Sequence, residues 1–264
     1  MGDNDDIQNN EIKALEDRLK SLRAEKYKRL DLDKTNQEGL KKGIRKDGKI
    51  YSVRDNRSRF FYTSEWMKFF DKLNEKQKFT FNFLINTGCR INEARNIRVG
   101  DIDLDNKRVF VRITKVKAKK GEKNPKPRTI PISSQFAKYL RKVFRDNNLS
   151  NDCYLGSSRD NKNMPENCPL FKGGILSTPA GNIAMKNSLK RAGIKDWYNF
   201  SIHNIRKTLE TWLMALGIDG LKLVAHLGHD MKTASQHYVS PDVFRFEEKR
   251  DMRLIIGDLY QDRF

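Results

Sequence analysis

The chain of 264 residues is 37% hydrophobic and 33% charged, and its 53 Lys and Arg against 34 Asp and Glu give a formal net charge of +19. Such an excess favours nucleic acid or an anionic membrane surface as the partner. No run of about 18 apolar residues and no apolar signal-peptide core occur, which argues against a membrane span and against secretion. Three cysteines, Cys89, Cys153 and Cys168, form no Cys-x-x-Cys pair and are interpreted as unlinked thiols in a reducing cytoplasm.

The first 60 residues differ from the rest of the chain. Ile12, Leu15, Leu19 and Leu22 recur at helical spacing between charged residues, which predicts an amphipathic helix over about residues 8–30. Residues 33–59 are polar and basic and contain glycine, and we interpret them as a linker or as a DNA-contacting arm that orders on binding. Residues 1–60 are therefore predicted to form a basic, helical arm without a core of its own.

From residue 60 onward the sequence predicts packed helices. Thr63 or Ser64 is suited to cap a helix with a spaced apolar series, and the aromatic residues between Phe79 and Ile85 predict a buried helix. Further helices are predicted over residues 91–97, 136–144 and 183–192, with a helix start near residue 178, then two helices after residue 203 separated by residues 217–219, and a helical, charged tail.

One hairpin is predicted between these helices. Residues 108–114 alternate apolar and polar side chains, and residues 128–132 read as the partner strand. The segment between them, residues 115–127, holds six lysines and one glutamate, and a loop of this length tends to be functional.

Two pairs of residues share a helical spacing of three. His203 and Arg206 would lie on one face of a helix. His226 and His229 have the spacing of zinc ligands, but no cysteine or third histidine is placed to complete a site, so no metal is expected. His226 is interpreted instead as a residue that packs or lies at the edge of bound DNA.

Three segments, taken in chain order, resemble the motifs of the tyrosine recombinase (phage integrase) family. They are TGCRINEARNIRVGDID, HNIRKTLETWLMALGID and HLGHDMKTASQHY, with the expected lysine-rich hairpin between the first two. The resemblance covers about residues 60–245. It implies a mainly α (α+β) fold for residues 61–264, namely an integrase-type catalytic domain of packed helices with a small antiparallel β-sheet, followed by a C-terminal helical tail.

The resemblance also implies the site residues. The implied catalytic residues are Arg90, Lys115, His203, Arg206, His229 and Tyr238. Glu93 falls on the acidic position of the first motif and is expected to orient active-site groups. Lys115 matches the hairpin lysine best, and Lys117 is the alternative because this loop is longer than usual. Tyr238 is implied to be the nucleophile.

These residue types suit attack on a DNA phosphodiester. Two guanidinium groups can hold the phosphate oxygens and stabilise the negative charge of the transition state. A phenol with a pKa near about 10 needs cationic neighbours and a histidine to lose its proton. The family's product is a 3′-phosphotyrosine and a free 5′-hydroxyl, whose leaving oxygen would be protonated by the hairpin lysine. The covalent bond conserves the energy of the broken one, so no ATP, metal or other cofactor is expected.

The resemblance implies double-stranded DNA as partner and a homotetramer on DNA, in the cytoplasm of a prokaryotic cell, at the nucleoid. DNA-contact candidates are Arg45, Lys46, Lys119, Lys120, Lys123 and Lys126. Family members often carry a core-binding domain of about a hundred residues, and the shorter arm here resembles reduced integrases of archaeal mobile elements. The tail after Tyr238 is expected to dock on a neighbouring catalytic domain, with packing in its own chain as the alternative.

Other classes remain as alternatives. A type IB topoisomerase shares the chemistry but would relax supercoils as a monomer. A catalytically silent DNA-binding relative would keep the fold, although buried charges are costly to retain without a use. A metal-dependent nuclease would need clustered Asp and Glu, and no such cluster is evident.

Overall fold

The chain divides into two compact units in the computed structural model, Met1–Arg57 and Ser58–Phe264. The structure describes residues 41–44, 50–53, 59–112, 127–156, 171–228 and 244–261. The helix predicted over about residues 8–30 lies outside these ranges.

Unit 1 contains an antiparallel hairpin formed by β1 (Lys41–Ile44) and β2 (Ile50–Val53). The interpretation of this segment as a linker or arm did not include these strands. The signal was present in the sequence, because the dipeptide Asp47-Gly48 favours a tight turn and the residues of β2 favour extended backbone.

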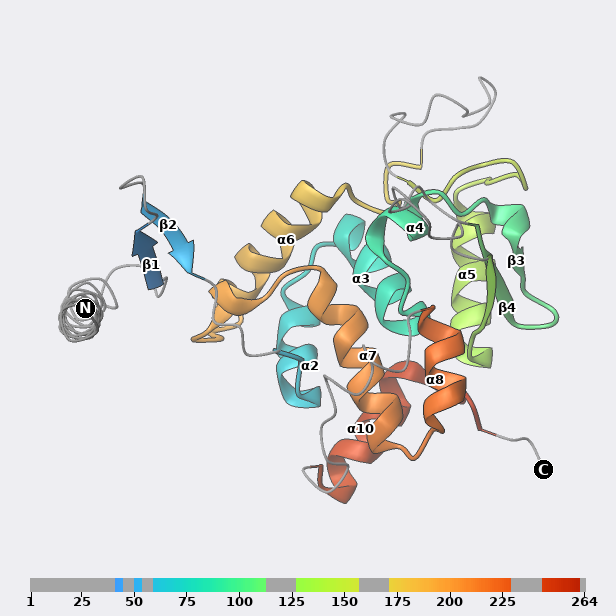
Figure 1. The fold of residues 1–264 in the computed structure, drawn as a ribbon. Helices are drawn as coiled ribbons and strands as arrows, with labels where there is room; N and C mark the ends of the chain where they lie inside the picture. The colour runs from blue at the N-terminus through green and yellow to red at the C-terminus, as the bar shows by residue number, and fades with distance from the viewer. Residues whose placement is uncertain are drawn as a thin grey trace, which may run out of the picture. The chain divides into compact units, whose positions relative to one another are not determined.

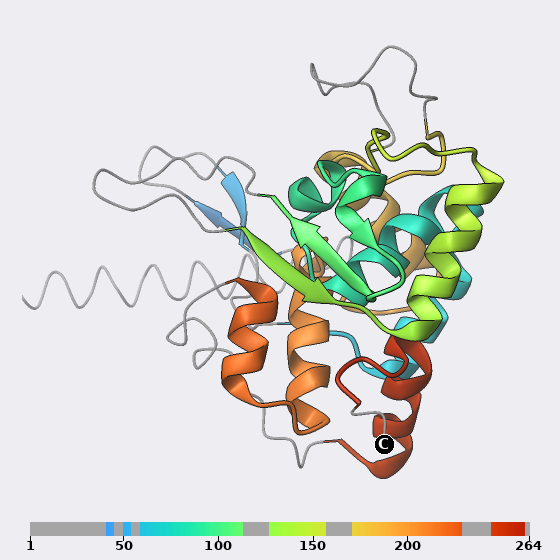
Figure 2. The ribbon, with the colours of Figure 1, turned by 90° about the vertical axis from the view of Figure 1, so that its right-hand side faces the viewer.

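Unit 2 consists of helices and one small sheet (Figures 1 and 2). The helices are α2 (Thr63–Asp71), α3 (Glu75–Thr87), α4 (Ile91–Arg95), α5 (Ser134–Asp146), α6 (Thr178–Arg191), α7 (His203–Ala215), α8 (Gly220–Leu227) and α10 (Phe246–Ile256). The strands are β3 (Ile102–Asp103), β4 (Arg108–Val111) and β5 (Arg128–Pro131), and 3-10 turns span Val99–Asp101 and Trp197–Asn199. The fold is mainly α with a small antiparallel sheet, as predicted.

The sheet has the order β3-β4-β5, and the predicted pairing of β4 with β5 is confirmed. Val109 faces Ile130 across that pair, and both are buried. The next residue, Phe110, is 41% exposed, so the alternation that predicted the strand reflects one buried face. β3 was not predicted because two residues are too few to show a period.

The core of unit 2 is built around α3 and α7, which pack against each other (Figure 1). Phe79, Phe81 and Phe83 of α3 are all buried, although they cannot share one face of a helix. Neighbours on several sides explain this: α4, α6, α7 and α10 contact α3, and Phe136 of α5 packs edge-on against Phe83 with ring centroids 5.8 Å apart.

A short strap at the start of unit 2 fixes α7. The backbone N–H of Phe61 donates to Thr208 Oγ1 at 2.9 Å, and Trp212 Nε1 donates to the carbonyl of Phe61 at 3.0 Å. One turn earlier, Asn204 Nδ2 donates to the carbonyl of Arg59 at 2.6 Å. These three bonds hold the helix that begins with His203.

The tail packs within its own chain. Met252, Ile256 and Leu259 are fully or almost fully buried, and α10 contacts α2, α3 and α7. The Asp258 carboxylate accepts hydrogen bonds from both the backbone N and the Oγ of Ser134, each at 2.6 Å, at the start of α5. These apolar residues complete the core of unit 2, which is the packing in cis named as the alternative, and docking of the tail on a neighbouring domain stays a prediction.

The cysteines depart from expectation in one case. Cys89 is free and buried, but Cys153 is disulfide-bonded, so the interpretation of all three thiols as unlinked is wrong. Sequence spacing does not report how closely two Cα atoms approach in the fold, which decides whether a disulfide is possible. Within the described part of the chain, no helix is both long and apolar enough to cross a membrane.

Candidate active site

The first motif places Arg90 at a break between two helices. Gly88 ends α3 in the left-handed region with φ 62°, and Arg90 is the N-cap of α4 in extended conformation. The backbone N–H of Arg90 donates to Glu93 Oε2 at 2.9 Å, which satisfies one of the free N–H groups at the start of α4. The Arg90 side chain is 44% exposed, so its guanidinium is accessible to a bound anion.

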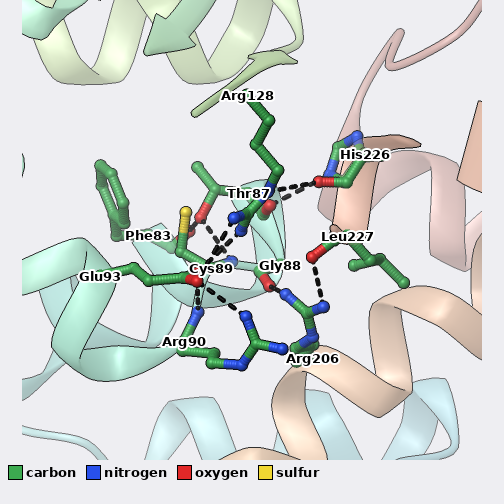
Figure 3. A network of polar contacts seen from close by, with 10 residues as sticks. All are labelled: Phe83, Thr87, Gly88, Cys89, Arg90, Glu93, Arg128, Arg206, His226 and Leu227. Carbon is green, nitrogen blue, oxygen red and sulfur yellow. Dashed lines mark hydrogen bonds and ion pairs between the residues drawn. The ribbon is translucent and has the colours of Figure 1, made fainter. Parts of the chain in front are cut away.

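Glu93 lies between two arginines (Figure 3). Its Oε1 accepts from Arg90 Nη1 at 2.8 Å, and its Oε2 accepts from Arg128 Nη2 at 2.7 Å. Burial alone would raise the pKa of this carboxyl, but the hydrogen bond and charge of Arg128, together with the bonds from Arg90, lower it to about 2. Glu93 is therefore ionised at neutral pH and forms an ion pair with Arg90, and its orienting role stays a prediction.

Arg206 is buried, with 4% of its surface exposed, and contacts the two other motifs. Its Nη1 donates to the carbonyl of Gly88 at 2.8 Å, and its Nη2 donates to the carbonyl of Leu227 at the end of α8. Burial and the nearby charge of Arg90 lower the pKa of Arg206 to about 10, which leaves it cationic at neutral pH.

His203 begins α7 and reaches the surface. Partial burial, followed by the positive charges of Arg206 and Arg90, lowers its pKa below the ordinary value, although Glu210 opposes this. The imidazole is therefore neutral near pH 7 and can accept a proton. Arg90, Arg206 and His203 lie close enough for their charges to interact, and Figure 3 shows the two guanidinium groups close together.

Several predicted site residues lie outside the described ranges. They are Lys115, Lys117, His229 and Tyr238, and the DNA-contact candidates Arg45, Lys46, Lys119, Lys120, Lys123 and Lys126. His229 follows Gly228, the left-handed C-cap of α8, in the sequence. The structure brings together Arg90, Glu93, His203 and Arg206, while the catalytic roles of these four and all the other assignments stay predictions.

His226 is a packing residue, which is one of the two interpretations made from the sequence. It is 1% exposed, and its Nε2 and Nδ1 lie 3.0 Å from the Thr87 carbonyl and 2.9 Å from the Tyr260 hydroxyl. Burial lowers its pKa to about 3, so the ring is neutral. It cannot lie at an exposed DNA edge in this structure, and it links α8 to the turn before Arg90 and to the tail.

Arg128 was not predicted as a site residue. Sequence reasoning assigned it only to a strand, yet its guanidinium contacts Glu93 and the carbonyl of His226. The one available signal was an arginine at the start of a strand that directly follows the lysine-rich loop. Among the described residues, no group of three or more His, Cys, Asp or Glu is placed to hold a metal ion.

Comparison with known proteins identifies the family of the chain. A family model described as the phage integrase family matches residues 59–243, which is more than half of the chain. The tyrosine recombinase XerH of Campylobacter jejuni is 27% identical over 191 residues, which cover 69% of this chain and 48% of XerH. The chain thus spans about half the length of this curated relative.

Solved structures show the same fold at low identity. The XerA recombinase is 18% identical with a TM-score of 0.52, over 78% of this chain and 66% of XerA. The Tn1549 transposon integrase, in complex with transposon right end DNA, is 14% identical with a TM-score of 0.54, over 76% and 66% of the two chains. With the family match over residues 59–243 and the site geometry, the chain belongs to the phage integrase family of tyrosine recombinases.

Proposed function

We propose that this chain is a site-specific DNA recombinase that cleaves and rejoins DNA through Tyr238. The observation that carries the proposal is the group formed by Arg90, Arg206 and the neutral His203. Burial and the nearby charge of Arg90 make the cationic form of Arg206 less favourable, which lowers its pKa. An anion bound between the two arginines would relieve the repulsion of their charges, and a phosphodiester is the anion that matches two guanidinium groups.

The proposed cleavage step is an in-line attack. The oxygen of Tyr238 forms a bond to phosphorus while the bond from phosphorus to the 5′-oxygen breaks, which leaves a 3′-phosphotyrosine and a 5′-hydroxyl. Arg90 and Arg206 stabilise the charge that develops on the non-bridging oxygens. His203, neutral before the reaction, accepts or shares the phenol proton, and His229 is assigned to the same group of residues.

The 5′-oxygen needs a proton as it leaves. Lys115 is proposed as the donor, with Lys117 as the alternative, since both lie within six residues of the end of β4 in the sequence. Rejoining is the reverse attack by a 5′-hydroxyl of the partner duplex, and two rounds pass through a Holliday junction. The phosphotyrosine bond retains the energy of the broken phosphodiester, so the proposed reaction uses neither ATP nor a metal.

The proposed partner is double-stranded DNA, bound as a homotetramer in the cytoplasm of a prokaryotic cell. The formal charge of +19 supports a polyanionic partner. Lys119, Lys120, Lys123 and Lys126 follow in the lysine-rich loop, and Arg45 and Lys46 lie in sequence between β1 and β2. Contacts of these residues with phosphates would add affinity that falls with salt but carries little sequence information.

Covalent trapping tests the proposal. Wild type, Tyr238→Phe and Tyr198→Phe, a control tyrosine outside the three motifs, are incubated in EDTA with labelled, nicked DNA from the flanks of the gene itself. Denaturing gels then report protein–DNA adducts. We expect an adduct with wild type and Tyr198→Phe and none with Tyr238→Phe.

Two results would contradict the proposal. An adduct that persists in Tyr238→Phe would assign the nucleophile to another residue. Relaxation of supercoiled plasmid by the monomer, without any requirement for a second DNA site, would indicate a topoisomerase instead.

A further inference from the structure

Arg128 connects three parts of the site that are far apart in the sequence. It is the first residue of β5, and only 14% of its side chain is exposed. Its Nη2 and Nη1 donate to the two oxygens of Glu93 at 2.7 and 3.3 Å, while its Nε donates to the carbonyl of His226 at 3.0 Å. A single planar group therefore joins the β4–β5 hairpin to α4 and to the end of α8 (Figure 3).

The contact with Glu93 continues to Arg90. Glu93 uses Oε1 to accept from the Arg90 guanidinium at 2.8 Å and Oε2 to accept from the Arg90 backbone N–H at 2.9 Å. A carboxylate with free rotation could satisfy these bonds in several ways. Because Arg128 holds both of its oxygens in one plane, Glu93 presents a single orientation to Arg90.

The contact with α8 uses carbonyls that a helix leaves unsatisfied at its C-terminal end. Arg128 donates to the carbonyl of His226, and Arg206 donates to that of the next residue, Leu227. Gly228 follows with φ +68°, and a Cβ at this position would lie 2.9 Å from Arg128 Cδ and 3.1 Å from its Nε. The glycine of the third motif is thus the residue that leaves room for Arg128.

We propose that Arg128 is a positioning residue for strand cleavage: it acts through Glu93 to hold Arg90 in the orientation that binds the scissile phosphate. This inference rests on the proposed recombinase function and extends it. Lysine cannot replace Arg128, since a single ammonium on a flexible stem cannot make the paired bonds to Glu93 and the bond to His226 together.

Single-turnover cleavage of the nicked DNA, at saturating protein, tests the inference. Arg128→Gln removes the charge, and Arg128→Lys keeps the charge but loses the planar group. Arg108→Gln is the matched control, because Arg108 lies in the same sheet, is 56% exposed and pairs with Asp103. We expect both Arg128 variants to cleave on the order of 10²-fold more slowly, as for a misplaced active-site group. The control should cleave at the wild-type rate.

Three further readouts separate positioning from general damage. DNA affinity of the Arg128 variants should stay within about twofold of wild type, because no phosphate contact is removed. In a double-mutant cycle with Arg90→Ala, adding Arg128→Lys should slow cleavage by less than about threefold, since its effect passes through a residue already removed. Carbon-13 titration of the Glu93 carboxyl should give a higher pKa in Arg128→Lys than in wild type.

Failure of the positioning role and failure of the proposed function give different results. Cleavage by Arg128→Lys at the wild-type rate, or a full additional loss on top of Arg90→Ala, overturns the positioning role. An unchanged Glu93 pKa in Arg128→Lys also overturns it, and this measurement needs no DNA. Absence of adduct from wild type and the Arg108 control alike would instead refute the proposed function on which the inference rests.

Discussion

Arg206 donates from Nη1 to the carbonyl oxygen of Gly88, over 2.8 Å, and this bond joins the second motif to the turn that precedes Arg90. The two residues are 118 positions apart in the chain. Gly88 also approaches the third motif, since a Cβ on it would lie 2.7 Å from Leu227 Cδ2. The positions of Arg90 and Arg206 therefore both depend on Gly88, which has no side chain.

We expect Gly88→Ala to destabilise the protein and to slow DNA cleavage. The alanine would have to adopt φ 62° and would also press against Leu227 and Leu209, at 2.7 and 3.0 Å. A left-handed non-glycine residue and an overpacked contact each cost about 1–3 kcal/mol. Gly217→Ala is the control, because it has φ +82° but no atom within 4 Å of its Cβ. Urea unfolding should show a larger loss for Gly88→Ala; equal losses would mean that the close contact contributes nothing.

The pH dependence of cleavage should reflect His203. Its pKa is lowered by partial burial and by neighbouring cations, Lys207 among them, so the neutral, proton-accepting form persists below the ordinary pKa of about 6.5. The kcat/KM of cleavage should therefore rise with pH below about 6.5 and be level at neutral pH. The His203→Gln variant should cleave about 10²–10⁴-fold more slowly. Its pH profile should lack the acidic limb, which is the rise of kcat/KM with pH below about 6.5.

A change of charge beside His203 tests the cause of its lowered pKa. Lys207→Gln removes one cation, so the pKa of His203 should rise and the acidic limb should shift to higher pH. Proton NMR titration of the His203 ring measures this directly in the free protein. An unchanged or lower His203 pKa in Lys207→Gln would show that repulsion from Lys207 does not contribute.

The free energy of unfolding should decrease at acidic pH because of His226. Its folded-state pKa is lowered to about 3 by burial, whereas the unfolded value is about 6.5. Its contribution to stability is thus fully present above pH 6.5 and is lost progressively as pH falls toward 3, because only the unfolded chain takes up the proton. Between pH 6.5 and 4.5, the free energy of unfolding of His226→Gln should depend less on pH than that of wild type. Parallel curves for the two proteins would contradict this assignment, and His203→Gln controls for the other described histidine.

The cis packing of the tail can be tested without DNA. Ile256→Ala should lower the free energy of unfolding of the isolated protein by about 2–5 kcal/mol, since Ile256 is fully buried. Leu254→Ala, on the same helix but 77% exposed, should change it by less than about 0.5 kcal/mol. If both variants unfold like the wild-type monomer, the tail does not complete the core of its own chain.

Local sequence patterns predicted most of unit 2. The apolar spacing around Trp66 and the dense aromatics of Phe79–Ile85 both lie on observed helices, and the alternation from Arg108 predicted β4. These signals are local, because a helix or strand repeats its buried positions within a few residues. The hairpin of β1 and β2 was missed, since a polar, basic segment shows little of this contrast.

The sequence by itself determined which chemistry is available: the motifs around Arg90, His203 and Arg206, their order, and the helices that carry them. Only the tertiary structure decided which of these groups form ion pairs or hydrogen bonds with one another. Arg128 meets Glu93 from 35 residues away, and His226 meets Tyr260 from 34. Such pairs leave no period in the sequence, because their distance is set by how α3, α8, β5 and the tail pack. For the same reason, the tail of this chain proved to be part of its own core.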